Sequence, residues 1–266
     1  MSVVEAALSE GKWIVVRPSR YARRITATTP IRIAGPVARS NWVKTADDAS
    51  STIALGTFAN CAHGFTPWGT FLSCEENWQG HFSQTNALSD HERRYGISAK
   101  GGGYRWWEFD ARFDVATNPN EPNRFGWVVE KDPFDPKSLP VKRTALGRFK
   151  HESAMQSIAP DGRLVFYMGD DERFEYIYKF VSRDAWNAQD RAANRDLLDH
   201  GTLFVASFNV GGAGVWLPLV HGEGPLTLSN GFGSQADVLV MTRQARRFAG
   251  CHKNGSPGVD RGTPRN

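Results

Sequence analysis

Acidic side chains gathered in a few short segments are the feature of this sequence best suited to chemistry. They stand in three short segments: Cys74-Glu75-Glu76, His151-Glu152, and Asp170-Asp171-Glu172 with Glu175 just beyond. Adjacent carboxylates repel one another unless a cation or solvent separates them, and calcium takes carboxylate oxygens as ligands. The segments therefore indicate ligands for a hard cation. For Asp170–Glu172, a solvated acidic loop is the simpler alternative.

Cys74 adds a thiol to the first of these segments. A cysteine at the end of an apolar run is usually a small buried hydrophobic residue. Cys74 differs because Glu75 and Glu76 follow it directly, and a thiolate beside carboxylates is disfavoured unless a cation is present. A metal ion would deprotonate the thiol and bind the acids. Cys61 has no acidic neighbours in the sequence and is interpreted as structural.

Other kinds of site find little support. There is no Gly-x-Ser-x-Gly elbow, no Walker phosphate loop and no His-Glu-x-x-His pair. The net charge is +4, from 32 basic and 28 acidic residues, and basic residues cluster only at Arg20–Arg24 and Arg243–Arg247. A nucleic-acid interface normally has a basic stripe with aromatic residues among it. We therefore expect no nucleic-acid partner.

The elements that must hold these residues are predicted to be mainly strands. Residues Phe174–Phe180 alternate aromatic with other side chains, which is the period of a strand. Further strands are predicted at Leu164–Met168, Leu203–Val210 and Val238–Thr242, and one helix at Arg183–Leu198. The uncharged stretch Leu203–Gly222 is interpreted as two strands around a turn rather than a membrane span. Long loops are expected at Asn77–Gly103 and Val115–Arg143, and such loops often carry the functional site. The pattern alone leaves a sandwich, a barrel and a propeller open.

Several long motifs resemble the PhoX family of bacterial alkaline phosphatases. They are Asn60-Cys61-Ala62, Thr66-Pro67-Trp68-Gly69-Thr70, Cys74-Glu75-Glu76-Asn77, the run from Asn118 to Trp127, the run from Pro140 to Phe149 with His151-Glu152, and Tyr167-Met168-Gly169-Asp170-Asp171. The strand at Phe174–Phe180 and the segment Gly201-Thr202-Leu203 also match. The resemblance extends over about Thr29 to Gly250.

The resemblance implies an all-β fold of β-propeller type with long loops. It implies a central site that holds iron and calcium and hydrolyses phosphate monoesters. By resemblance, Cys74 would bind the iron pair, and Glu75, Glu76 and Glu152 would be carboxylate ligands. Asp170, Asp171 and Glu175 would complete the calcium shell. The family also implies small phosphorylated substrates and a periplasmic or secreted location; we expect a monomer with no membrane partner.

The two ends of the chain depart from the family pattern. No export signal is recognised at the start, so residues 1–250 are expected to be a partial propeller domain, incomplete at both ends. The resemblance stops near Gly250. With one choice of codons, reading Cys251–Gly262 one base later gives Ala-Thr-Arg-Met-Asp-Arg-Pro-Glu-Trp-Ile-Ala, which is similar to the family's continuation. Residues 251–266 are therefore expected to be a frameshifted tail, and the activity of this chain to be reduced or lost.

Two other functions remain open from the sequence. One is a non-catalytic β-propeller that binds a metal or ligand through the same acidic loops. The other is a lactonase-type propeller with one divalent ion, which would need no thiolate ligand. Iron bound together with calcium would favour the phosphatase over both.

Overall fold

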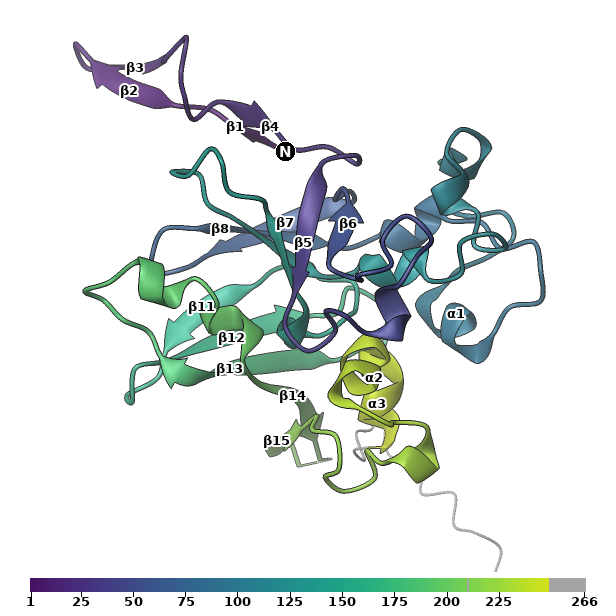
Figure 1. Ribbon diagram of the computed structural model, residues 1–266. Coiled ribbons are helices and arrows are strands. Elements are labelled where there is room, and N and C mark those ends of the chain that lie inside the picture. The colour runs from purple at the N-terminus through teal and green to yellow at the C-terminus, as the bar shows by residue number, and fades with distance from the viewer. Residues whose placement is uncertain (210, 249–266) are drawn as a thin grey trace, which may run out of the picture.

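The fold consists mainly of two β-sheets. The computed structural model describes residues 1–209 and 211–248. One sheet has six strands in the order β6-β5-β10-β9-β8-β7: β5 (Pro30–Ala34), β6 (Ile53–Leu55), β7 (Asn60–Phe65), β8 (Phe71–Glu75), β9 (Val128–Lys131) and β10 (Val141–Arg143). The other has five strands in chain order: β11 (Met155–Ile158), β12 (Arg163–Gly169), β13 (Ile177–Ala185), β14 (Gly201–Phe208) and β15 (Gly214–Pro218). β5 and β10 run parallel, and the other neighbouring strands run antiparallel (Figure 1).

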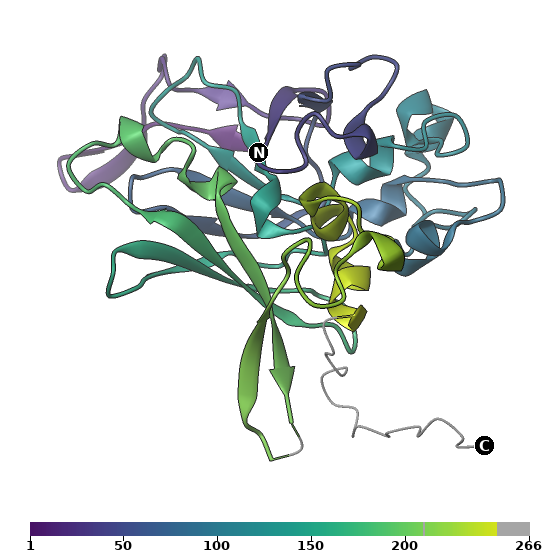
Figure 2. The same ribbon diagram turned by 60° about the horizontal axis from the view of Figure 1, so that its bottom comes forward.

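Helices are short and lie to one side of the sheets. They are α1 (Asp90–Tyr95), α2 (Gln235–Val240) and α3 (Thr242–Phe248); α2 and α3 lie beside the β14–β15 hairpin, as Figure 2 shows. Short 3₁₀ turns occur at Asn41–Val43, Trp78–His81, Trp106–Glu108, Ala111–Phe113, Glu121–Arg124, Thr144–Leu146, Ala192–Asn194, Leu197–Asp199 and Leu228–Asn230. In the described residues, no helix is long and apolar enough to cross a membrane. The prediction of a mainly β protein with few helices is confirmed.

Two smaller sheets form at the N-terminus. β1 (Ser2–Val3) pairs with β4 (Arg23–Arg24), and β2 (Ala6–Ser9) pairs with β3 (Lys12–Val15). The β2–β3 hairpin extends away from the two larger sheets (Figure 1). Its Trp13 is 74% exposed, so the hairpin contributes little to the core.

The main core is shared by both larger sheets. It includes Leu72 and Cys74 of β8, Phe166 of β12 and Tyr178 of β13, all buried. β7 and β11 come close because Gly64 has no side chain: a Cβ there would lie 2.0 Å from the Ala154 carbonyl oxygen. This close approach brings the end of β7 against the segment that leads into β11.

The helix predicted at Arg183–Leu198 is wrong. β13 continues to Ala185, which pairs with Arg163 of β12. Beyond it, the Asn194 side chain accepts a hydrogen bond from Asn187 N at 2.7 Å and donates to Asn187 O at 2.8 Å. Side chains that bond to nearby backbone compete with a helix in this way. Two 3₁₀ turns stand where the helix was expected.

The strand predicted at Val238–Thr242 is also wrong, because α2 and the start of α3 occupy it. Ser234 caps α2 by accepting a hydrogen bond from Asp237 N at 3.2 Å. A short apolar run fits a buried helix as well as a strand.

The other strand predictions are mostly confirmed. β12 covers its predicted run, and β14 covers Leu203–Phe208 of the run predicted to Val210, a residue outside the described part of the chain. β14 and β15 form the expected hairpin. The aromatic alternation is real in Tyr176, Tyr178 and Phe180, which are buried, but β13 begins only at Ile177. Of the expected loops, Asn77–Gly103 contains α1 and Val115–Arg143 contains β9 and β10. The expected boundary after Gly250 lies outside the described residues.

Candidate active site

The acidic segments meet where four parts of the chain come together. These are the start of β7, the end of β8, the segment before β11 and the segment after β12. Backbone hydrogen bonds join them: Glu76 N donates to Ala59 O at 3.0 Å, and His151 N donates to Glu75 O at 3.0 Å. His151 also forms a β-bridge with Asp170. Segments 75 residues or more apart in sequence therefore lie side by side.

The alternation of side chains along each segment decides which of two consecutive residues faces the outside. Successive side chains of an extended segment point to opposite faces. The first member of each pair is buried, and the second is more open: Glu75, His151 and Asp170 are buried, Glu76 is half-buried, and Glu152 and Asp171 are exposed. The structure thus separates acids that the sequence grouped together.

Glu75 is fully occupied by protein partners. Its Oε1 accepts a hydrogen bond from Lys142 Nζ at 2.7 Å, and both side chains are fully buried. Its Oε2 accepts from the backbone N–H groups of Gly126 and Trp127 at 3.0 and 3.1 Å. A carboxylate with this many donors and a buried cation is stable in the interior without a metal.

Asp170 is likewise paired, with an arginine from α3. Arg243 Nε donates to Asp170 Oδ2 at 2.7 Å, and Arg243 Nη2 donates to Oδ1. Asp170 Oδ1 also accepts from Lys150 N at 3.3 Å. The two side chains are almost completely buried. Asp170 therefore neutralises a buried guanidinium.

Glu175 is held by two further arginines. Arg94 Nη2 of α1 lies 2.6 Å from Glu175 Oε2, and Arg246 Nη2 of α3 lies 3.0 Å from the same oxygen. The Glu175 side chain is only 6% exposed. Its carboxylate thus links two helices.

Glu76 and Asp171 face each other instead. Their carboxyl groups are hydrogen-bonded, and burial together with this contact raises the pKa of Glu76. Neighbouring carboxylates repel one another unless a cation lies between them. Glu76 also contacts the Cys61 thiol. These three groups form one continuous polar cluster.

Cys61 rather than Cys74 is the cysteine in this cluster. Cys61 is an exposed residue. The pKa of its thiol is nevertheless raised, first by partial burial and then by the nearby carboxylates of Glu76 and Glu152. Cys74 lies in the core, where burial raises the pKa of its thiol to about 12. The sequence interpretation missed Cys61 because its acidic neighbours come from distant segments. The register shift between β7 and β8 after Asn60 marks the place.

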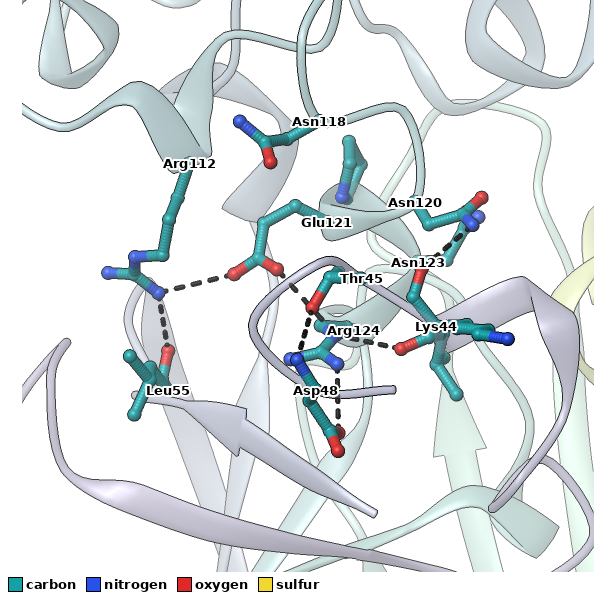
Figure 3. Close-up of polar contacts among 12 residues, drawn as sticks. Lys44, Thr45, Asp48, Leu55, Arg112, Asn118, Asn120, Glu121, Asn123 and Arg124 are labelled. Carbon is teal, nitrogen blue, oxygen red and sulfur yellow. Dashed lines mark hydrogen bonds and ion pairs between the residues drawn. The ribbon is translucent and has the colours of Figure 1, made fainter. Parts of the chain in front are cut away.

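The run from Asn118 to Trp127 fastens residues 41–55, and Figure 3 shows Glu121 and Arg124 of this run with their partners. Arg124 donates to Val43 O and Ile53 O at 2.9 Å each, and its Nη2 lies 2.9 Å from Asp48 Oδ2. Glu121 is paired with Arg112 at 3.2 Å. These contacts pin residues 41–55 to the motif, whose last residues donate to Glu75 as described above.

Comparison with known proteins decides the family. A family model described as alkaline phosphatase PhoX matches residues 1–258. The chain belongs to the PhoX family. Among solved structures it is similar to Pseudomonas fluorescens PhoX in complex with vanadate, a transition state analogue, with 52% sequence identity and a TM-score of 0.91. The match covers 95% of this chain and 45% of that one, so the chain spans less than half of the neighbour's length. No curated protein matches.

Membership in the PhoX family, whose enzymes are metal-dependent phosphatases, raises the question of whether these residues fit a metal. The cluster offers the Cys61 thiol and the carboxylates of Glu76 and Asp171, and the Glu152 carboxylate lies near the thiol. These are the donors that iron and calcium take. The contact between the carboxyl groups of Glu76 and Asp171 marks a place where a cation would relieve repulsion. Within residues 1–209 and 211–248, however, no three Cys, His, Asp or Glu side chains are placed to hold one ion together. The donors fit in kind, and their arrangement is incomplete.

A separate cavity of about 640 Å³ lies elsewhere on this PhoX-family chain. Its lining includes Trp68, Glu130, Arg143 and Arg191, and none of the acidic cluster. The charges there are paired with each other: Arg143 Nε lies 2.6 Å from Glu130 Oε2. The cavity and the acidic cluster are therefore separate features of this chain.

Proposed function

We propose that this chain carries part of the active site of a metal-dependent phosphomonoesterase. The observation that supports this most is the cluster of Cys61, Glu76, Glu152 and Asp171, which gathers donors for cations at the ends of four segments. Family membership gives the cluster its reaction class. The β-propeller arrangement and the periplasmic or secreted location that the family implies belong to the same proposal.

The donor types divide by chemistry. Cys61 would bind iron through its thiolate, and Glu76, Glu152 and Asp171 would bind iron or calcium through carboxylate oxygens. Bound cations would neutralise the phosphoryl oxygens of a small phosphate ester and stabilise the charge of its transition state. Vanadate, which the Pseudomonas fluorescens neighbour holds as a transition state analogue, is a suitable probe for such a site.

The buried partners of these ligands have a supporting role in this proposal. Glu75 and Asp170 occupy the interior side of the same backbone segments and are neutralised there by Lys142 and Arg243. Because each buried acid precedes an open one, the interior contacts orient Glu76 and Asp171 outward. A site on rigid segments with such support keeps its ligands in place before the cations bind.

The test combines activity with metal analysis. Hydrolysis of p-nitrophenyl phosphate is measured with calcium and iron, and the metal content of the purified protein is determined in parallel. We expect iron and calcium to be retained, and Cys61→Ser to remove the iron. The matched variant Cys74→Ser should keep it, because Cys74 lies in the core. Iron loss in Cys74→Ser alone would contradict the assignment.

A non-catalytic metal-binding protein is the alternative that the same experiment distinguishes. It is supported by the described residues, in which no three possible ligands are placed to hold one ion. Calcium retained without iron and without hydrolysis would support it. Hydrolysis that depends on both metals would exclude it.

A further inference from the structure

We infer that α3 positions the acidic loop, residues 170–175, through Arg243, so that Asp171 stays against Glu76 before any cation binds. The inference rests on the proposed function, because it concerns how the ligands of the proposed cation site are positioned. It makes Arg243 a positioning residue: it touches Asp170, and it acts on Asp171 through the chain.

Arg243 binds the Asp170 carboxylate in a bidentate, buried ion pair. Arg243 binds both carboxylate oxygens of Asp170, and its Nη1 also lies 3.5 Å from Glu172 Oε2. A planar guanidinium that binds both oxygens fixes the orientation of the carboxylate as well as its place. Because Asp170 and Asp171 are consecutive in an extended segment, fixing one side chain inward directs the next outward.

Arginines also hold the far end of the acidic loop. Glu175 is paired with Arg94 and with Arg246, which lies one turn after Arg243 on α3. Between the two ends, Asp170 N donates to Tyr176 O at 3.1 Å and Asp171 N donates to Lys150 O at 3.0 Å. The loop is thus closed on itself and fastened to α3 at both ends.

α3 itself is anchored by contacts that involve neither the acidic loop nor a cation. Thr242 Oγ1 accepts a hydrogen bond from Arg148 N at 3.1 Å. Val240, the last residue of α2 and two residues before α3 begins, accepts at its carbonyl a hydrogen bond from Tyr95 Oη at 2.8 Å. The helix therefore provides a fixed point for the loop in the metal-free protein.

The experiment follows the acidic loop directly. Hydrogen exchange of the backbone amides of residues 170–175 is measured in metal-free protein, and calcium affinity is measured separately by titration with calcium chloride. Three proteins are compared: wild type, Arg243→Lys, and the double variant Asp170→Asn with Arg243→Met. The double variant removes both charges, so no unpaired ion is left buried in a folded protein.

Both variants should exchange these amides about tenfold faster or more, since the loop would open locally. Their calcium affinity should fall about 10- to 100-fold, as for other groups that orient metal ligands. The matched control is Arg143→Lys, which alters a buried arginine pair with Glu130 away from the loop. It should leave the exchange of residues 170–175 and the calcium affinity unchanged.

Unchanged exchange of residues 170–175 in a folded double variant would overturn the inference. An equal increase in exchange in Arg143→Lys would also overturn it. The exchange measurement uses no metal. If wild type binds no calcium, the proposed function fails, and faster exchange in the variants still supports the positioning by Arg243.

Discussion

Neighbouring carboxylates Glu75 and Glu76 should respond in opposite ways to the same substitution. The structure places Glu75 in the interior against Lys142 and Glu76 outward against Asp171. Glu75→Gln and Glu76→Gln each remove one negative charge and preserve size. Comparison of the two variants therefore tests which carboxylate stabilises the fold and which one is a cation ligand.

The expected magnitudes follow from the partners. Glu75→Gln leaves the Lys142 ammonium buried without its anion at 2.7 Å, and breaking a fully buried pair costs about 3–5 kcal/mol. For a chain of this size each kcal/mol shifts Tm by roughly 2–4 °C, so Tm should fall by roughly 6–20 °C. Glu76→Gln removes repulsion from Asp171 and should change the free energy of unfolding by no more than about 0.5 kcal/mol at pH 5.

The pH dependence gives a second readout for Glu76. Its pKa is raised above the ordinary value of 4.5, first by burial and then by Asp171. The folded state then holds a proton that the unfolded chain has released, so this contribution to stability is full below pH 4.5 and is lost as the pH rises through the raised pKa. Metal-free Glu76→Gln should therefore gain stability relative to wild type as the pH rises above 4.5.

Urea and thermal unfolding with chelator present measure both effects. Calcium titration of the same proteins completes the comparison: Glu76→Gln should weaken binding, although it leaves the metal-free fold intact. If Glu76→Gln destabilises the metal-free protein as much as Glu75→Gln does, the inward and outward assignment of these two acids is wrong.

Three other outcomes are expected. Burial, with a smaller effect of Arg148, lowers the pKa of His91 to about 4. Because the unfolded chain then binds a proton that the folded protein does not, wild type should lose about 1.4 kcal/mol of stability per pH unit as the pH falls from 6.5 towards 4. In urea unfolding, His91→Gln should lose stability less steeply over this range, and equal slopes for the two proteins would contradict this. Iodoacetamide followed by peptide mass mapping should modify Cys61 and leave Cys74 unmodified in the folded protein, and modification of Cys74 first would show that the core assignment is wrong. Gly64→Ala should destabilise strongly because its Cβ would meet Ala154 O at 2.0 Å, whereas Gly169→Ala, with nothing within 4 Å, should be tolerated; similar Tm values for the two would refute the close approach of β7 and β11.

Local patterns predicted strands of the five-stranded sheet, because each strand's signal lies within its own residues, but predicted no strand of the six-stranded sheet. β12, β14 and the buried side chains of β13 follow from alternation and turn residues. The helix at Arg183–Leu198 failed because Asn187 and Asn194 bond to the backbone, a competition that apolar spacing does not reveal. α1 did carry a local signal, the capping box of Ser89 and Glu92 with Gly96 after the helix.

The site was predictable only in part, for a physical reason. Sequence identified three acidic segments, but the partners that neutralise Glu75, Asp170 and Glu175 come from Lys142, Arg243 and other distant residues. A local reading cannot tell a paired buried acid from an open one. The sequence does show that consecutive side chains of an extended segment point to opposite faces. It does not show which of the two is buried until the burial of one of them is known. Cys61 had no such signal, since Glu76 and Glu152 reach it only through the fold.

The most direct test of the account is anomalous diffraction at the iron edge from crystals of the protein grown with iron and calcium. The account predicts iron bonded to the Cys61 sulfur, with calcium on the carboxylates of Glu76, Glu152 or Asp171. Metal bonded to Cys74, Asp170 or Glu175, or crystals without bound metal, would contradict it.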